Sequence, residues 1–258
     1  MEAGLRTPLL DFFRRGDASR DVRLLAAQGA IAPRPLEQLA LLMHLTSDDD
    51  AEVRDTAEQT LRKIPADVVA GLAARADAPT DLREFFSARG IPPAPAPRQE
   101  GDAPLVDEDD TDYGSDEATP EAKADTARRV SDMTVPEKVK AAMKGTREMR
   151  AILIRDPNRM VASAVLSCPK ITEQEVETYA RMANVSDEIL RTIGHTRAWI
   201  KNYAITQALT KNPKTPLALS LTLIHRLNDR DLRGLSIDRN VPEPLRIAAR
   251  KKVVLGAK

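Results

Sequence analysis

Apolar residues recur at three- and four-residue intervals along most of this chain, and the positions between them are polar. In residues 1–90 this spacing predicts a helix from Ser19 to Gln28, a second from Pro35, a third ended by Pro65, and shorter helices around 66–75 and 80–88. The connections between these helices span two to six residues, which favours antiparallel neighbours.

The second half of the chain carries the helical spacing more regularly. Thr172 and Glu175 form the pattern of a capping box, and Gly145, Pro169 and Gly194 are expected to end helices. The predicted apolar stripes are Val139, Ala142 and Met143; Val161, Ala164 and Val165; Val176, Tyr179 and Ala180; Ile189, Leu190 and Ile193; Ile200, Tyr203, Ala204 and Ala208; Leu217, Leu221 and Ile224; and Leu245, Ala248 and Ala249.

Four asparagines divide this half of the chain. Asn158, Asn184, Asn212 and Asn240 are 26, 28 and 28 residues apart. A fixed period of roughly 20–50 residues is typical of stacked-helix solenoids. Asparagine caps helix ends and tolerates the backbone angles of tight turns, so these residues are predicted to be caps and turns rather than ligands. The pattern predicts an all-α fold, an α-solenoid of short antiparallel helix pairs.

The paired helices with Asp/Asn-Pro turns, as in DPNRMVASAVLSCPKIT and KNPKTPLALSLTLIHRL, resemble the HEAT-like and leucine-rich-variant helical repeats of bacterial proteins. Residues 78–82 (APTDL) are similar to residues 212–217 (NPKTPL), so the first half looks related to the second. The resemblance implies a binding scaffold. Iron–sulfur members of the variant class carry a cysteine cluster, and with one cysteine in this chain no cluster is expected.

Residues 91–133 interrupt the helical pattern. The stretch IPPAPAPRQEGDAP is proline-rich and predicts extended backbone, and the following VDEDDTDYGSDEATPEAKAD is acidic with few apolar groups, which predicts disorder from about residue 92 to 133. We therefore expect three parts: an N-terminal helical block over residues 1–90, a disordered proline-rich and acidic linker over 91–133, and a C-terminal helical block over 134–258.

The net charge of zero conceals a division along the chain. Residues 1–90 carry a net charge of −3, residues 91–136 carry −8, and residues 137–258 carry +11. This asymmetry favours either an acidic partner for the basic block or an acidic tether that screens it. The simpler alternative is a solvated, arginine-rich helical surface.

The bulk composition narrows the class of protein. Aromatic residues make up 3% of the chain, so the core must consist mainly of Leu, Ile, Val and Ala, which suit helices. A single cysteine, Cys168, excludes an internal disulfide and indicates a reducing compartment. The first residues show no signal-peptide pattern, and the apolar runs fall short of the ~20 residues that a bilayer requires. We expect a cytoplasmic protein without membrane insertion.

The sequence offers little for catalysis or metal binding. His44, His195 and His225 are too far apart in sequence for a zinc-ligand spacing, and His44 is expected at the edge of the core. Cys168 has no neighbouring base and is expected to be a buried spacer. No glycine-rich phosphate loop is present, and the acidic tract does not match a calcium loop. No metal, cofactor or enzymatic activity is therefore expected.

Three alternating glutamates, Glu173, Glu175 and Glu177, raise the question of acid–base chemistry. Paired carboxylates catalyse proton transfer when burial separates their pKa values. A helix N-terminus attracts anions through its dipole, however, and these glutamates fall at a predicted helix start. Exposure at that start is the preferred interpretation.

Basic residues form the most plausible functional set. If the repeats stack with similar orientation, cations near equivalent turns would line one edge, where Trp199 and Tyr203 could add one aromatic contact. The candidate partner-binding residues are Arg155, Arg159, Arg191, Arg197, Trp199, Lys201, Lys211, Lys214, Arg226, Arg230 and Arg239.

The sequence favours a non-enzymatic protein-interaction scaffold whose binding face lies on the basic C-terminal block, with a protein partner of acidic character. The alternative is a nucleic-acid-binding protein that uses a basic solenoid stripe, with the acidic linker acting as an autoinhibitor. The low aromatic content weighs against that alternative, because grooves for single strands rely on stacking aromatics. The sequence does not determine the oligomeric state or the identity of the partner.

Overall fold

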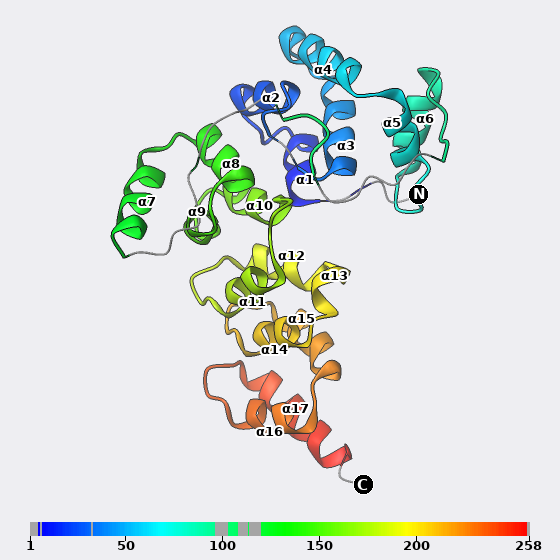
Figure 1. Cartoon of the computed structure of the whole chain (residues 1–258). Coiled ribbons are helices and arrows are strands. Elements are labelled where there is room, and N and C mark those ends of the chain that lie inside the picture. Colours follow the sequence, from blue (N-terminus) through cyan, green and yellow to red (C-terminus); the bar gives the residue numbers. More distant parts are fainter. Residues whose placement is uncertain are drawn as a thin grey trace. The chain divides into compact units, whose positions relative to one another are not determined.

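The computed structural model describes residues 5, 7–31, 33–95, 103–107, 113 and 120–256, and every regular element within them is a helix (Figure 1). The all-α class predicted from the sequence is confirmed. The helices are α1 (Pro8–Arg14), α2 (Arg20–Ala27), α3 (Pro35–Leu45), α4 (Ala51–Lys63), α5 (Ala66–Ala73), α6 (Thr80–Ala88), α7 (Pro120–Asp132), α8 (Val135–Lys144), α9 (Arg147–Leu153), α10 (Arg159–Ser167), α11 (Glu173–Arg181), α12 (Asp187–His195), α13 (Arg197–Ile200), α14 (Tyr203–Lys211), α15 (Leu217–Leu223), the 3₁₀ turn η1 (Ile224–Arg226), α16 (Asp229–Ile237) and α17 (Glu243–Gly256).

The chain divides into two compact units, Met1–Lys170 and Ile171–Lys258. We call them the N-terminal unit and the C-terminal unit. The sequence pattern predicts that residues 134–170 belong to the C-terminal block. In the structure these residues belong to the N-terminal unit, where α8 packs against α2 and α10 packs against α1. Helical periodicity shows that a face is apolar, but it does not show which neighbour covers that face.

Helix α3 forms the centre of the N-terminal unit. It contacts α1, α2, α4 and α6, and nine of its eleven residues are buried. Leu39 and Leu42 have no exposed surface, and neither do Leu9 and Leu10 of α1. At about 25 cal/mol per Å² of buried apolar surface, leucines of this kind stabilise the fold by roughly 2 kcal/mol each. The first turn of α3 also buries two polar residues, Glu37 and Gln38.

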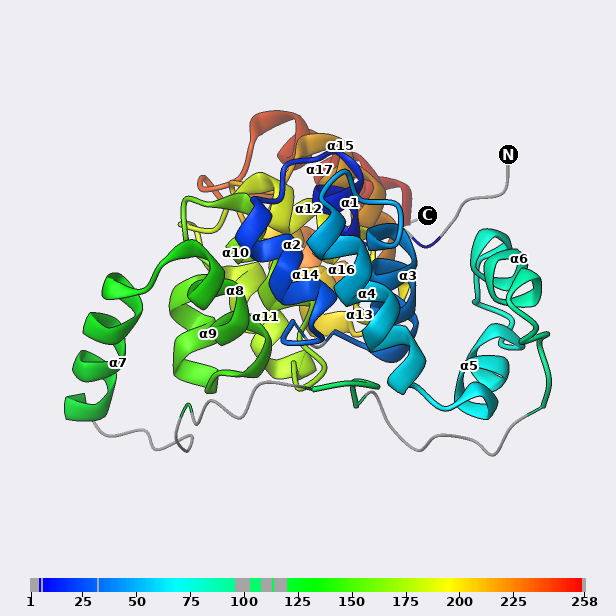
Figure 2. The same cartoon turned by 90° about the horizontal axis from the view of Figure 1, so that it is seen from above.

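The disorder expected over residues 92–133 differs from the structure in two places. Helix α7 lies inside that range and packs against α9, as Figure 2 shows. Its sequence is rich in Ala, Glu, Lys and Arg, which are strong helix formers, and its Val130 is buried. Residues 103–107 contact α3 and α8. Residues 96–102, 108–112 and 114–119 of the predicted linker lie outside the described residues.

The C-terminal unit contains three helical hairpins, α11 with α12, α14 with α15, and α16 with α17. Helices α11 and α14 run parallel, as two hydrogen bonds show. A bond from Asn202 Nδ2 to Glu173 Oε2 (2.7 Å) joins the starts of the two helices. A bond from Asn212 Nδ2 to the Ala180 carbonyl (2.8 Å) joins their ends. The starts of α14 and α16 also meet, since the Asn228 N–H donates to the hydroxyl oxygen of Tyr203. In Figure 1, α11, α14 and α16 follow one another along this unit.

Three of the four regularly spaced asparagines occupy equivalent places. Asn184, Asn212 and Asn240 lie in the turns that join the two helices of each hairpin. Asn158 differs, because it lies in the N-terminal unit and caps α10, its side chain accepting a bond from the Met160 N–H (2.9 Å). The interpretation of these residues as caps and turns is confirmed, but the repeat of hairpin turns begins at residue 184.

Gly194 does not end its helix as expected. It lies in the last turn of α12, where a Cβ atom would come within 2.4 Å of Leu219 Cδ2. A side chain here would therefore require the Leu219 side chain of α15 to shift, whereas the backbone angle of Gly194 is not a left-handed one. Gly145 follows the last residue of α8, as the sequence predicts.

Candidate functional site

Four exposed cations lie near the starts of helices in the C-terminal unit. Arg197 is the first residue of the short helix α13, Lys201 follows the last residue of α13, Arg226 ends η1, and Arg230 lies in the first turn of α16. We call these four residues the basic edge. All four are among the candidates predicted from the sequence, and all four are exposed in one unit.

Two bonds link the segments that carry these cations. Arg226 Nη1 donates to the carbonyl oxygen of Ile200 at 2.9 Å, which places this guanidinium beside the residue that precedes Lys201. The Asn228 N–H donates to the Tyr203 hydroxyl at 3.2 Å, which brings the start of α16 to the start of α14. The break between α13 and α14 makes the first contact possible, because it leaves the Ile200 carbonyl outside a helical ladder.

Asp231 is partly buried and is engaged by residues outside this edge. Asp231 accepts bonds from the Tyr203 hydroxyl and from Gln207 Nε2, and it pairs with Lys211 at 3.7 Å. The bond from Tyr203 is the main cause that lowers the pKa of Asp231. Within the described part of the chain, neither a hydrogen bond nor an ion pair joins a carboxylate to Arg197, Lys201 or Arg230.

One cation of this region is missing from the sequence-based set. Lys252 of α17 donates from Nζ to the Ile224 carbonyl at 3.3 Å and lies 3.3 Å from His225 Nδ1, next to Arg226. The run of three cations at residues 250–252 is the sequence signal that could have identified it. The periodic spacing of the asparagines ends at Asn240, before this last helix, so it does not indicate Lys252.

The remaining candidates lie elsewhere. Arg191 pairs with Asp187 on its own helix at 3.6 Å. Lys214 and Arg239 lie in the turns at the far ends of α14 and α16, and nine residues of helix span about 13 Å. Arg155 and Arg159 belong to the N-terminal unit, where Arg155 Nε donates to the Ala151 carbonyl.

Of the two aromatic residues that could add a contact, Trp199 and Tyr203, the structure leaves only the second exposed. Only 8% of Trp199 is exposed, so its ring is part of the packing between α13 and its neighbours. Tyr203 is 41% exposed and is the aromatic residue that the basic edge presents. Burial raises the pKa of Tyr203, and its bond to Asp231 acts in the same direction.

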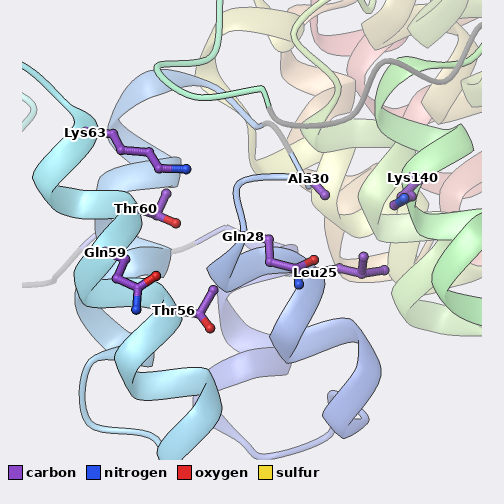
Figure 3. Close-up of a pocket in the computed structure, with 8 residues that line it drawn as sticks. All are labelled: Leu25, Gln28, Ala30, Thr56, Gln59, Thr60, Lys63 and Lys140. Carbon is purple, nitrogen blue, oxygen red and sulfur yellow. The ribbon is translucent and has the colours of Figure 1, made fainter.

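A second region of interest lies in the N-terminal unit. A hollow of about 450 Å³ lies between α2, α4 and α8, and its lining is largely polar (Figure 3). Thr56, Gln59, Thr60 and Lys63 line it from α4, and Lys140 lines it from α8.

Glu37 is a buried titratable group in the same unit. Its carboxylate accepts bonds from the hydroxyls of Thr7 and Ser167, which tie α3 to the start of α1 and to the end of α10. Burial raises the pKa of Glu37 to about 7. The Glu37 carboxyl is buried among α1, α3 and α10, so it joins these helices rather than facing a substrate.

Compared with known protein families, curated proteins and solved structures, the chain shows no match. Among the described residues, no group of three His, Cys, Asp or Glu side chains is placed to hold a metal ion. No helix in the described ranges is both long enough and apolar enough to cross a membrane.

Proposed function

We propose that this chain is a non-enzymatic interaction scaffold, an α-solenoid of the HEAT-like or leucine-rich-variant kind, whose C-terminal unit binds an acidic segment of a partner protein. The observation that carries the proposal is the bond from Arg226 to the Ile200 carbonyl, which brings one cation of the basic edge beside the residue that precedes Lys201. Four exposed positive side chains lie on or beside three elements of this unit, and none of them has an internal carboxylate partner among the described residues.

The stacked hairpins support this function physically. Parallel helices such as α11 and α14 present equivalent ends on one side of the unit, so side chains at those ends form an extended surface. Like charges held close together repel one another, and an acidic ligand relieves that repulsion. Electrostatic complementarity of this kind raises association rates and sets partner choice more than it raises affinity.

Nucleic acid is the alternative ligand, and it shares the negative charge. Binding of single strands without sequence preference usually relies on stacking aromatics. Trp199 is buried, which leaves Tyr203 as the exposed aromatic of this edge. The observations therefore favour an acidic peptide.

The test compares two double variants of the full chain that change the net charge equally. Lys201→Glu with Arg230→Glu reverses two cations of the basic edge, and Lys214→Glu with Arg239→Glu reverses two at the opposite turns. A fluorescein-labelled peptide of alternating Glu and Gly is titrated against each by anisotropy at low ionic strength. The first variant is expected to lose about tenfold in affinity, equivalent to about 1.4 kcal/mol, and the second is expected to lose little.

Equal losses in the two variants would show that only net charge matters, which would contradict a specific site. An oligonucleotide of equal charge is titrated in parallel. If it binds the basic edge more tightly than the peptide, and if proteins captured from cells are lost after nuclease treatment, the nucleic-acid alternative replaces the proposal.

A further inference from the structure

A short non-helical segment, Ala103–Asp107, lies against helices of the N-terminal unit. It belongs to no helix, and the contacts that hold it come from α3, α8 and the turn after α2. The mode of its attachment resembles the binding of a peptide by a receptor more than the packing of a structural element.

The backbone of the segment is bound by a single buried side chain. Gln38 Oε1 accepts from the Leu105 N–H at 2.6 Å and from the Val106 N–H at 3.1 Å, while Gln38 Nε2 donates to the Val106 carbonyl at 2.7 Å. Gln38 is only 1% exposed, and among the described residues its side chain has no other hydrogen-bond partner. A buried carboxamide left without partners costs about 1–3 kcal/mol, so this site requires an occupant.

The side chains of the segment add specificity. Val106 lies directly over Gly29, where a Cβ atom would come within 2.8 Å of Val106 Cγ1. Gly29 has a φ of +80°, an angle that glycine adopts readily, and its lack of a side chain leaves the room that Val106 fills. Asp107 then forms an ion pair with Lys144 of α8, whose side chain is 11% exposed. An apolar residue followed by an acid therefore matches the site.

The polar hollow adjoins this site. Thr60, which lines the hollow, would lie 3.6 Å from the same Cβ position on Gly29. Lys140 lines the hollow one helical turn before Lys144 on α8. A peptide bound through Gln38 thus passes next to a space with hydroxyl, amide and ammonium groups, which suits further polar or acidic side chains.

We propose that Gln38, Gly29 and Lys144 form a recognition site for a non-helical peptide of apolar–acidic sequence, which this chain fills with its own Leu105-Val106-Asp107 and a partner protein fills by displacing that segment. Gln38 forms hydrogen bonds with the peptide backbone, Gly29 leaves room for the apolar side chain, and Lys144 forms an ion pair with the acidic side chain. The site is separate from the basic edge, so its failure and the failure of the proposed function are distinguishable.

The intramolecular segment competes with a partner through its effective concentration. A tethered ligand is present at roughly millimolar effective concentration, so a free peptide with the same contacts binds only weakly while the segment stays in place. Weakening the internal segment is therefore expected to expose the site to a free peptide.

The test uses the full chain and a fluorescein-labelled peptide with the sequence GDAPLVDEDD, which corresponds to residues 101–110. Val106→Lys weakens the internal segment, because lysine cannot pack on Gly29 and brings a positive charge towards Lys144. The peptide is expected to bind this variant about tenfold more tightly than the wild type. A scrambled peptide of the same composition is expected to bind neither.

A second variant tests the site itself. Gln38→Met, combined with Val106→Lys, keeps the volume of the side chain and removes the three bonds, so peptide binding is expected to be lost while helicity by circular dichroism is kept. Equal binding to the wild type and to Val106→Lys, or binding that survives Gln38→Met, would overturn the proposal. A wild-type dimer that Val106→Lys dissociates would overturn it too, since the occupant would then be the segment of a second copy.

Discussion

The side chain of Asn212 bridges two hairpins of the C-terminal unit. Its Nδ2 donates to the Ala180 carbonyl at 2.8 Å and to the Met182 carbonyl at 3.0 Å, while its Oδ1 accepts from the Lys214 N–H at 2.9 Å. Asn212 is 4% exposed, whereas Asn184 and Asn240, at equivalent turns, are exposed. The three asparagines share a spacing, but only one of them joins neighbouring hairpins through its side chain.

Replacing Asn212 by alanine is expected to destabilise the C-terminal unit by about 2–3 kcal/mol. The loss follows because two carbonyl groups and one N–H group lose their partner in a buried place. Urea unfolding followed by circular dichroism measures the change. Asn240→Ala is the matched control, and a change below about 0.5 kcal/mol is expected there because the side chain is exposed. Equal effects of the two substitutions would contradict the bridging role.

The sequence predicts those features whose cause is local. The capping box of Thr172 and Glu175 forms as expected, with the Thr172 N–H donating to Glu175 Oε2 at 3.1 Å, because both partners lie within one helical turn. The same pattern did not show that Glu175 is 2% exposed and also bonds Tyr179, contrary to the expected exposure of the three glutamates.

Features that depend on distant contacts were not predictable from the sequence. The bonds between Gln38 and residues 105–106 join positions 67 and 68 residues apart, and five residues are too few to show a periodic pattern. The position of Arg226 beside Ile200 likewise depends on a bond to a backbone carbonyl 26 residues away. The four cations of the basic edge could be named from the sequence, but the contact between η1 and the residue that ends α13 could not.

Tyr203→Phe is expected to raise the pKa of Asp231. The hydroxyl of Tyr203 is the main cause of the lowered pKa of that carboxylate, and phenylalanine removes it. Because the folded pKa is lowered, Asp231 stabilises the fold above its unfolded pKa, and this stabilisation is lost as the pH falls through the folded pKa. NMR titration of the Asp231 carboxyl measures the change, with Asp229 as an internal control. An unchanged titration of Asp231 would contradict the assigned cause.

Cys168 is expected to resist thiol reagents in the folded protein. Its side chain has no exposed surface, and Sγ donates to the Met143 carbonyl at 3.0 Å. A thiol reagent requires both access and a thiolate, so labelling should occur only when the N-terminal unit opens. The labelling rate is measured with and without urea. Rapid stoichiometric labelling without denaturant would contradict the burial.

Glu37 is expected to make stability depend on pH between about 4.5 and about 7. Its carboxyl has an ordinary value of 4.5 in the unfolded chain and a folded pKa of about 7, because burial disfavours the charged form despite the bonds from Thr7 and Ser167 and the nearby Arg34. As the pH rises through this window, the unfolded state releases its proton first, so the folded state loses up to about 3 kcal/mol of stability relative to low pH.

The variant Glu37→Gln isolates this contribution from all other titrations. Glutamine keeps an oxygen that accepts from the Thr7 and Ser167 hydroxyls, and it carries no charge. At pH 4.5 and below, the variant and the wild type should therefore be similarly stable. Above pH 7 the variant should be the more stable, because only the wild type keeps a buried anion there. The carboxyls with lowered pKa values, including Asp50 and Asp77, titrate below this window and cancel in the comparison. Urea midpoints across the pH range measure the difference, and a constant difference at all pH values would show that the Glu37 carboxyl ionises as easily in the fold as in the unfolded chain.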